Sequence, residues 1–123
     1  MTIGNLYQSG DWKGEKHVPV IHAPEKVKAG ENFEVKINVG EAIGHPNTLE
    51  HHIAWFKLYY LPEEGKLPIE LGTWNFTAHG ESDTFTQPSV NTSVQLAKSG
   101  KLIATSYCNI HGLWENTVDV VVE

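Results

Sequence analysis

The segment Phe33-Glu34-Val35-Lys36-Ile37-Asn38-Val39 alternates strictly between apolar and polar side chains. Successive side chains of a β-strand point to opposite faces, so this period of two predicts a strand with one buried face. Helical spacing of apolar residues hardly occurs elsewhere in the chain. The segment therefore indicates that the protein folds mainly as β-structure.

Further segments rich in β-branched and aromatic residues predict more strands. They are Ile53–Leu61, Leu71–Ala78, Val90–Leu96, Leu102–Tyr107 and Val118–Val122. The first of them is almost uniformly apolar, which predicts a central strand with both faces covered. Turn-forming residues separate the segments at 28–32, 62–65 and 98–101. About seven short strands at this spacing are typical of an all-β, immunoglobulin-like antiparallel β-sandwich.

Length and composition exclude several classes of protein. The 123 residues suit one domain, and we expect residues 1–123 to form a single unit. A net charge of −6 argues against a nucleic-acid partner, because nucleic-acid-binding surfaces are basic. No apolar run approaches the roughly 20 residues of a membrane span, and the N-terminus lacks the apolar core of a signal peptide. We therefore expect a cytoplasmic protein without a membrane partner.

Cysteine and histidine usage is unusual, with one Cys beside seven His. The single cysteine cannot form an intrachain disulfide or a four-cysteine metal site. It lies in Ser106-Tyr107-Cys108-Asn109-Ile110-His111-Gly112, three residues before a histidine. A turn at the end of a strand can direct both side chains toward one ion, and this pair suits iron, copper or zinc. By itself the pattern fits a buried thiol near a surface histidine equally well.

The segment Gly44–His52 places three histidines within eight residues, just before the aromatic strand. Pro46 fixes its own backbone φ, so the segment can hold two imidazoles at a set separation. His51 and His52 are neighbours and would point to opposite faces of a strand. At most one of these two would therefore bind the same metal as His45, and periodicity leaves open which.

Near the N-terminus, Glu15-Lys16-His17 offers a further candidate ligand in His17. Glu15 is either a surface carboxylate or a labile oxygen ligand. Lys16 is either a solvated lysine or a cation that attracts an anion to the metal. His22 and His79 lie outside any such motif, and we expect them to have structural or surface roles.

Together these motifs resemble the signature segments of superoxide reductases, also called neelaredoxins. The matching segments are Glu15-Lys16-His17-Val18-Pro19, His45-Pro46-Asn47 with Glu50-His51-His52, Phe76–Ser82, and Ser106–Trp114. They follow the order of that family at compatible spacings, from about Gly10 to the C-terminus. Agreement among several independent motifs is far more specific than any one of them.

The resemblance implies one iron ion held by four equatorial imidazoles and one axial thiolate. Carried over by residue, the imidazoles belong to His17, His45, His51 and His111, and the thiolate to Cys108. The family uses the first histidine of the His51-His52 pair. Glu15 falls where the family has a carboxylate that takes the sixth position in the ferric state. Lys16 falls where the family has a lysine that attracts superoxide.

The resemblance also implies the activity, which is one-electron reduction of superoxide to hydrogen peroxide without release of dioxygen. It points to a rubredoxin-like electron donor. Some relatives carry an extra N-terminal domain with a four-cysteine iron site, but this chain has neither the length nor the cysteines for one. We further expect a homo-oligomer, a dimer or a tetramer, to which exposed tryptophans such as Trp12 or Trp114 could contribute.

Two other classes are compatible with a β-sandwich. A cupredoxin-like electron-transfer protein also has a Cys-x-x-His pair, but it uses two His, one Cys and a weak axial ligand such as Met. The only methionine here is Met1. A non-enzymatic immunoglobulin-like binding module would explain the strands and leave the clustering of Cys108 with histidines as coincidence. The identity of the bound metal discriminates among these classes.

Overall fold

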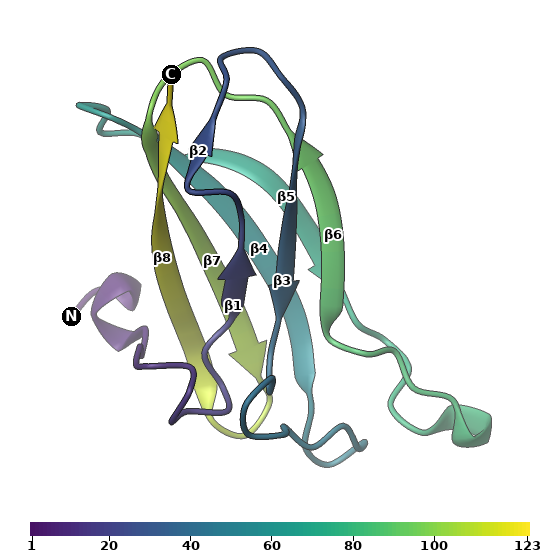
Figure 1. Cartoon of the computed structure of the whole chain (residues 1–123). Helices are drawn as coiled ribbons and strands as arrows, with labels where there is room; N and C mark the ends of the chain where they lie inside the picture. The colour runs from purple at the N-terminus through teal and green to yellow at the C-terminus, as the bar shows by residue number, and fades with distance from the viewer.

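The computed structural model describes residues 1–123 and shows two β-sheets packed face to face (Figure 1). The strands are β1 (Val20–His22), β2 (Lys26–Val27), β3 (Phe33–Asn38), β4 (Ile53–Pro62), β5 (Ile69–Asn75), β6 (Ser89–Val94), β7 (Gly100–Cys108) and β8 (Gly112–Val122). The only helices are two short 3₁₀ segments, η1 (Ile3–Leu6) and η2 (Glu81–Asp83). The predicted all-β sandwich is confirmed. No helix has the length and apolar character needed to cross a membrane.

One sheet has the strand order β1-β3-β6, and the other has the order β2-β8-β7-β4-β5. Every pair of neighbouring strands is antiparallel except β2 and β8, which run parallel. In that pair Lys26 lies opposite Val121, and Val27 lies opposite Val122. The predicted antiparallel architecture therefore has one parallel exception at the edge of the larger sheet.

The hydrophobic core lies between the two sheets. The alternation predicted for the segment after Asn32 is confirmed, since Phe33, Val35 and Ile37 are buried and the residues between them are exposed. Phe56 and Leu58 of β4 are completely buried and belong to the same cluster of 16 buried residues. Burying one such side chain contributes about 1.5–3 kcal/mol, so this core is the main stabilising feature of the sandwich.

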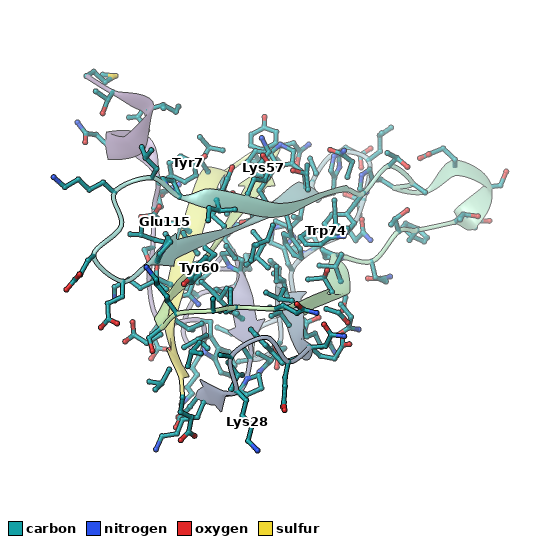
Figure 2. The ribbon with its side chains drawn as sticks, turned by 90° about the horizontal axis from the view of Figure 1, so that it is seen from above. Tyr7, Lys28, Lys57, Tyr60, Trp74 and Glu115 are labelled. Carbon is teal, nitrogen blue, oxygen red and sulfur yellow. The ribbon has the colours of Figure 1, made fainter.

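Strand β4 differs from its prediction, because only one of its faces is fully covered. Phe56 and Leu58 face the core, whereas Trp55, Lys57 and Tyr59 are half-buried on the outer face of the larger sheet. The N-terminal segment reaches this side of the molecule, where Tyr7 lies near Lys57 (Figure 2). The outer face of the larger sheet is therefore only partly covered.

Strand β8 begins at Gly112, well before the predicted Val118. The residues after Trp114 are polar and break the hydrophobic alternation, yet they pair with β7 along its length. Cys108 therefore ends β7 opposite Gly112, and the strands are joined by a tight turn over residues 109–111. Gly112 has φ +86°, a left-handed conformation that glycine adopts without a Cβ penalty.

Three connections meet at one end of the sandwich, the lower end in Figure 1. They are the segment before β1, the loop between β3 and β4, and the turn between β7 and β8. All of the sequence-predicted ligands belong to these connections or to the strand end beside them.

Candidate metal centre

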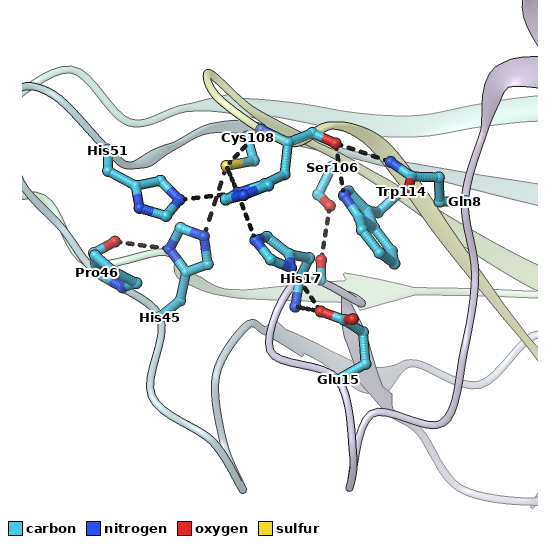
Figure 3. A network of polar contacts seen from close by, with 10 residues as sticks. Gln8, Glu15, His17, His45, Pro46, His51, Ser106, Cys108 and Trp114 are labelled. Atoms are coloured by element: carbon cyan, nitrogen blue, oxygen red, sulfur yellow. Dashed lines mark hydrogen bonds and ion pairs between the residues drawn. The ribbon is translucent and has the colours of Figure 1, made fainter.

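Four imidazole rings form a closed square at this end of the sandwich (Figure 3). The centroids of neighbouring rings are 4.5 Å apart for His17 and His111, and 5.0 Å apart for His111 and His51. The square closes with 4.7 Å between His51 and His45, and 4.9 Å between His45 and His17. The diagonal between His17 and His51 is longer, at 6.3 Å. The structure thus brings together all four histidines that the resemblance singled out.

Hydrogen bonds alone do not explain how the ring nitrogens are arranged. Nδ1 of His111 lies 3.0 Å from Nε2 of His17 and 3.2 Å from Nε2 of His51. A ring nitrogen carries one proton or one lone pair, so Nδ1 of His111 cannot satisfy both neighbours at once. Two nitrogens at a right angle and about 2.1 Å from one ion would lie about 3.0 Å apart. The spacing therefore fits adjacent ligands of a single metal ion.

The thiol of Cys108 lies beside two opposite corners of the square. Its Sγ is 3.6 Å from Nε2 of His45 and 3.8 Å from Nδ1 of His111. The ligand atoms of Cys108, His17, His45 and His51 all lie within 4.8 Å of one another. Near-equal distances to opposite corners place the sulfur over the middle of the square. Cys108 is completely buried and His111 is exposed, so the site has a protein side and a solvent side.

Hydrogen bonds fix which nitrogen two of these rings present. Nδ1–H of His45 donates to the carbonyl oxygen of Pro46 at 2.7 Å, and Nδ1–H of His17 donates to Oε1 of Glu15 at 2.5 Å. Each bond leaves the Nε2 lone pair facing the square, as partners outside the ligand shell commonly do in metal sites. Imidazole and thiolate donors together suit iron, copper or zinc, so the residues fit the predicted iron.

His17 is held on every side. Its backbone N–H donates to the same Oε1 of Glu15 at 2.8 Å, and its carbonyl oxygen accepts from Oγ of Ser106 at 3.3 Å. Its ring stacks on Trp114, with centroids 5.0 Å apart and an interplanar angle of 14°. Ser106 and Trp114 are the two ends of the segment Ser106–Trp114, but the sequence alone did not indicate a role at the site for either residue. The expectation of an exposed Trp114 is wrong, because it is 8% exposed and packs against the candidate ligand.

His45 follows a tight reversal of the chain at Gly40, which has φ +78°. A Cβ at this position would lie 2.6 Å from the backbone nitrogen of His45, so only glycine allows the approach. His51 is presented by a turn in which its N–H donates to Oγ1 of Thr48 at 3.1 Å. Strand β4 begins only at Ile53, so the neighbours His51 and His52 lie in the loop rather than in a strand. The structure brings His51 to the square and leaves His52 outside it.

Glu15 and Lys16 flank the square in different ways. Oε1 of Glu15 contacts Nδ1 of His17, on the side of the ring away from the Nε2 that faces the other ligands. In this structure Glu15 therefore orients a candidate ligand, and its sixth-ligand role in the ferric state stays a prediction. Lys16 is half-buried, and its positive charge acts on both His45 and His51.

The pKa values favour the ligand state of these groups. Burial, together with the charges of His17, His51 and Lys16, lowers the pKa of His45 to about 4. Burial also lowers the pKa of His51, with help from the charges of neighbouring histidines and Lys16. Burial alone would raise the pKa of Glu15, but its hydrogen bonds with His17 outweigh burial and lower it. Near neutral pH these imidazoles are uncharged and the carboxylate is ionised, as metal binding requires.

The remaining histidines lie elsewhere. Nε2 of His22 contacts Oε2 of Glu41 at 2.6 Å on the surface. His52 and His79 stack on each other with centroids 3.6 Å apart. Met1 is fully exposed at the N-terminus, so nothing here supplies the axial methionine of a cupredoxin-like site. Four clustered imidazoles also exceed the two that such a site uses.

Comparison with known proteins points in the same direction as the geometry. The family model described as desulfoferrodoxin matches residues 9–117. The superoxide reductase of Pyrococcus abyssi is 54% identical over 118 residues, with 96% of this chain and 98% of the relative covered. The neelaredoxin of Megalodesulfovibrio gigas is 41% identical over 130 residues and is covered in full, as is this chain.

Solved structures also superpose closely on this one. The superoxide reductase (neelaredoxin) from Archaeoglobus fulgidus in the reduced form gives a TM-score of 0.86 at 46% identity, with 94% of this chain and 98% of that chain covered. The superoxide reductase (neelaredoxin) from Ignicoccus hospitalis gives a TM-score of 0.85 at 39% identity, with both chains covered completely.

Proposed function

The chain belongs to the desulfoferrodoxin family, and from this premise we propose that it is a superoxide reductase with one iron ion in its domain of residues 1–123. One observation carries the proposal: four imidazoles form a square, and the only thiol of the chain lies over its middle. A cluster of this kind is hard to explain by the stability of the sandwich, because bringing polar rings together without a ligand costs free energy.

In this proposal His17, His45, His51 and His111 hold the iron through their imidazoles, and Cys108 holds it through its thiolate. When bound, iron supplies the one-electron redox chemistry that none of these side chains has. The backbone N–H of His111 donates to Sγ of Cys108 at 3.4 Å. Hydrogen bonds to a ligating sulfur are one of the levers by which proteins set a reduction potential.

The side chains also create a local attraction for a small anion. Neutral imidazoles leave the charge of a bound cation intact, whereas carboxylate ligands would cancel it. Lys16 adds a positive charge that already acts on two of the candidate ligands. Because the whole chain carries −6, attraction of superoxide must come from this local field rather than from net charge.

The proposed reaction balances when each superoxide takes one electron and two protons and leaves as hydrogen peroxide. We propose a rubredoxin-like carrier as the external source of the electron. Protons reach the site from its solvent side, where His111 is exposed and Lys16 is half-buried. Glu15 would be the residue to supply a sixth ligand to a bound ferric ion.

We also propose that the protein is a homo-oligomer, a dimer or a tetramer. The support is the outer face of the larger sheet, where Trp55 stacks with Tyr107 and Lys57 lies over the Trp55 ring. Partly exposed aromatic side chains that gather on one face are typical of protein–protein contacts. The single unpaired Cys108 thiol is consistent with a reducing compartment, and we propose the cytoplasm.

The test of this function combines metal analysis with rapid mixing against superoxide. We expect protein from its native host to hold one iron ion per chain and to consume superoxide without evolving dioxygen. A His22→Ala variant should behave in the same way, because His22 is a histidine outside the square. Copper as the native metal, or dioxygen release in the proportion of a dismutation, would overturn the proposal.

A further inference from the structure

His79 is a buried histidine that the proposed metal site does not use. It is 7% exposed and lies between β5 and η2. It belongs to the segment Phe76–Ser82, which resembles the family but has been given no role so far. Buried imidazoles need partners for both ring nitrogens, so the partners of His79 define what it does.

Both ring nitrogens of His79 face oxygen atoms. Nε2 lies 2.8 Å from the carbonyl oxygen of Phe76, and Nδ1 lies 2.9 Å from Oδ1 of Asn47. The amide nitrogen of Asn47 donates to the carbonyl oxygen of Thr86 at 3.1 Å, which directs its oxygen toward His79. Both oxygens lie within hydrogen-bond distance of the ring, so His79 links the end of β5 to the loop that carries Asn47.

Further contacts hold His79 in place. The carboxylate of Glu81 accepts from the backbone N–H of His79 at 3.0 Å. The ring of His52 stacks on His79 at 3.6 Å with an interplanar angle of 11°. Nδ1–H of His52 donates to the carbonyl oxygen of Thr48 at 2.9 Å, which fixes the orientation of this ring. Stacked aromatic rings attract each other, so the stack holds the pair together.

These contacts reach the loop that carries two candidate ligands. Asn47 lies between His45 and His51 in the sequence, and His52 directly follows His51. His79 therefore contacts the loop both between the two candidate ligands and just after the second of them. The backbone N–H of His52 also donates to Oδ1 of Asn109 at 2.9 Å, which ties the loop to the residue after Cys108.

We propose that His79 is a positioning residue, whose ring holds the loop of residues 45–52 so that His45 and His51 present their Nε2 atoms to one point. The inference rests on the proposed metal site and not on the reaction with superoxide. It predicts that removing the donors of His79 weakens metal binding without removing any ligand.

The test compares Zn²⁺ affinity by chelator competition in the full chain. His79→Phe keeps a flat ring for the stack but has no donors, and Asn47→Ala removes the acceptor that joins His79 to the loop. We expect each variant to bind Zn²⁺ about 10–100-fold more weakly, the range found when partners outside the ligand shell are removed. His79→Gln keeps an amide donor and should recover part of the affinity, whereas His22→Phe should leave it unchanged.

A second measurement needs no variant. In the Zn²⁺-loaded protein, ¹H–¹⁵N correlation across the imidazole rings should show a ring N–H of His79 that its hydrogen bond protects from exchange with water. A His79 ring proton that exchanges freely, or Zn²⁺ affinity unchanged in a folded Asn47→Ala protein, would overturn the inference. Failure of the proposed function would instead appear as absent superoxide reduction with these Zn²⁺ results intact.

Discussion

Replacing Glu15 with alanine tests its role at the site, because the structure shows a contact with His17 that the sequence did not predict. Oε1 of Glu15 accepts two hydrogen bonds from His17, at 2.5 Å from Nδ1 and at 2.8 Å from the backbone nitrogen. The structure therefore makes Glu15 a brace for His17. The family resemblance makes it a ligand of the ferric ion. Zinc separates the two roles, because Zn²⁺ undergoes no oxidation and needs no ferric sixth ligand.

The magnitude follows from the hydrogen bond to Nδ1, because this is the bond that orients the ring of His17. A bond to a charged group contributes about 1.5–3 kcal/mol. The side chain of Glu15 is 31% exposed, so water replaces part of what is lost and the lower end applies. A loss of about 1.4 kcal/mol is tenfold in affinity. We therefore expect Glu15→Ala to raise the Kd for Zn²⁺ about tenfold, measured by chelator competition at pH 7.

Glu15→Gln is the matched control, because its amide oxygen can still accept from Nδ1 of His17. It should retain most of the affinity that Glu15→Ala loses. If Glu15→Ala binds Zn²⁺ as tightly as the unmodified protein and changes only the ferric spectrum, the brace is refuted and Glu15 acts as a ligand alone.

Three further predictions concern other residues of the site. Cys108→Ser should abolish the thiolate-to-iron charge-transfer band in the visible spectrum, and an unchanged band would exclude Cys108 as a ligand. Lys16→Ala should slow the bimolecular reaction with superoxide and weaken its dependence on ionic strength in rapid-mixing experiments; an unaltered rate constant would make Lys16 an ordinary solvated lysine. The pKa of His45 is about 4 in the folded chain, below the value near 6.5 of an unfolded one. Between these values the unfolded chain binds a proton that the folded chain does not, so the stability of the metal-free protein rises with pH from about 4 to 6.5 and is lost as pH falls. Urea unfolding across this range should show a flatter slope for His45→Gln, and an equal slope would contradict the assignment.

Local pattern was sufficient for much of the fold. The alternation from Phe33 onward marks a real strand, because its buried face is set by side chains within that segment. The part of β8 before Val118 was not predicted, because its residues pair with β7 without having a hydrophobic pattern of their own. The partly exposed outer face of β4 was not predicted either. An apolar run in the sequence does not show whether a second layer of structure covers the strand.

Sequence spacing alone could identify candidate ligands but could not show that they meet at one site. His17 and His111 are far apart in the chain, and only the folded sandwich brings their nitrogens to 3.0 Å. The choice between His51 and His52 depends on the turn at Thr48, which periodicity does not encode. Family resemblance nominated His51, and the structure brings that ring to the square. The positioning role of His79 had no sequence signal beyond its motif, because Asn47 and His52, its partners on the metal-site loop, lie on a separate connection.

The hairpin that ends at Cys108 couples the metal site to strand register. Cys108 lies opposite Gly112 on β8 and opposite Ile53 on β4, and its side chain points into the sandwich. A slip of one residue in this pairing would turn every β7 side chain to the other face and carry the sulfur out of reach of the histidines. A chain with misaligned strands would therefore be unable to assemble the five donors. Metal uptake would therefore report whether β7 is paired in the correct register.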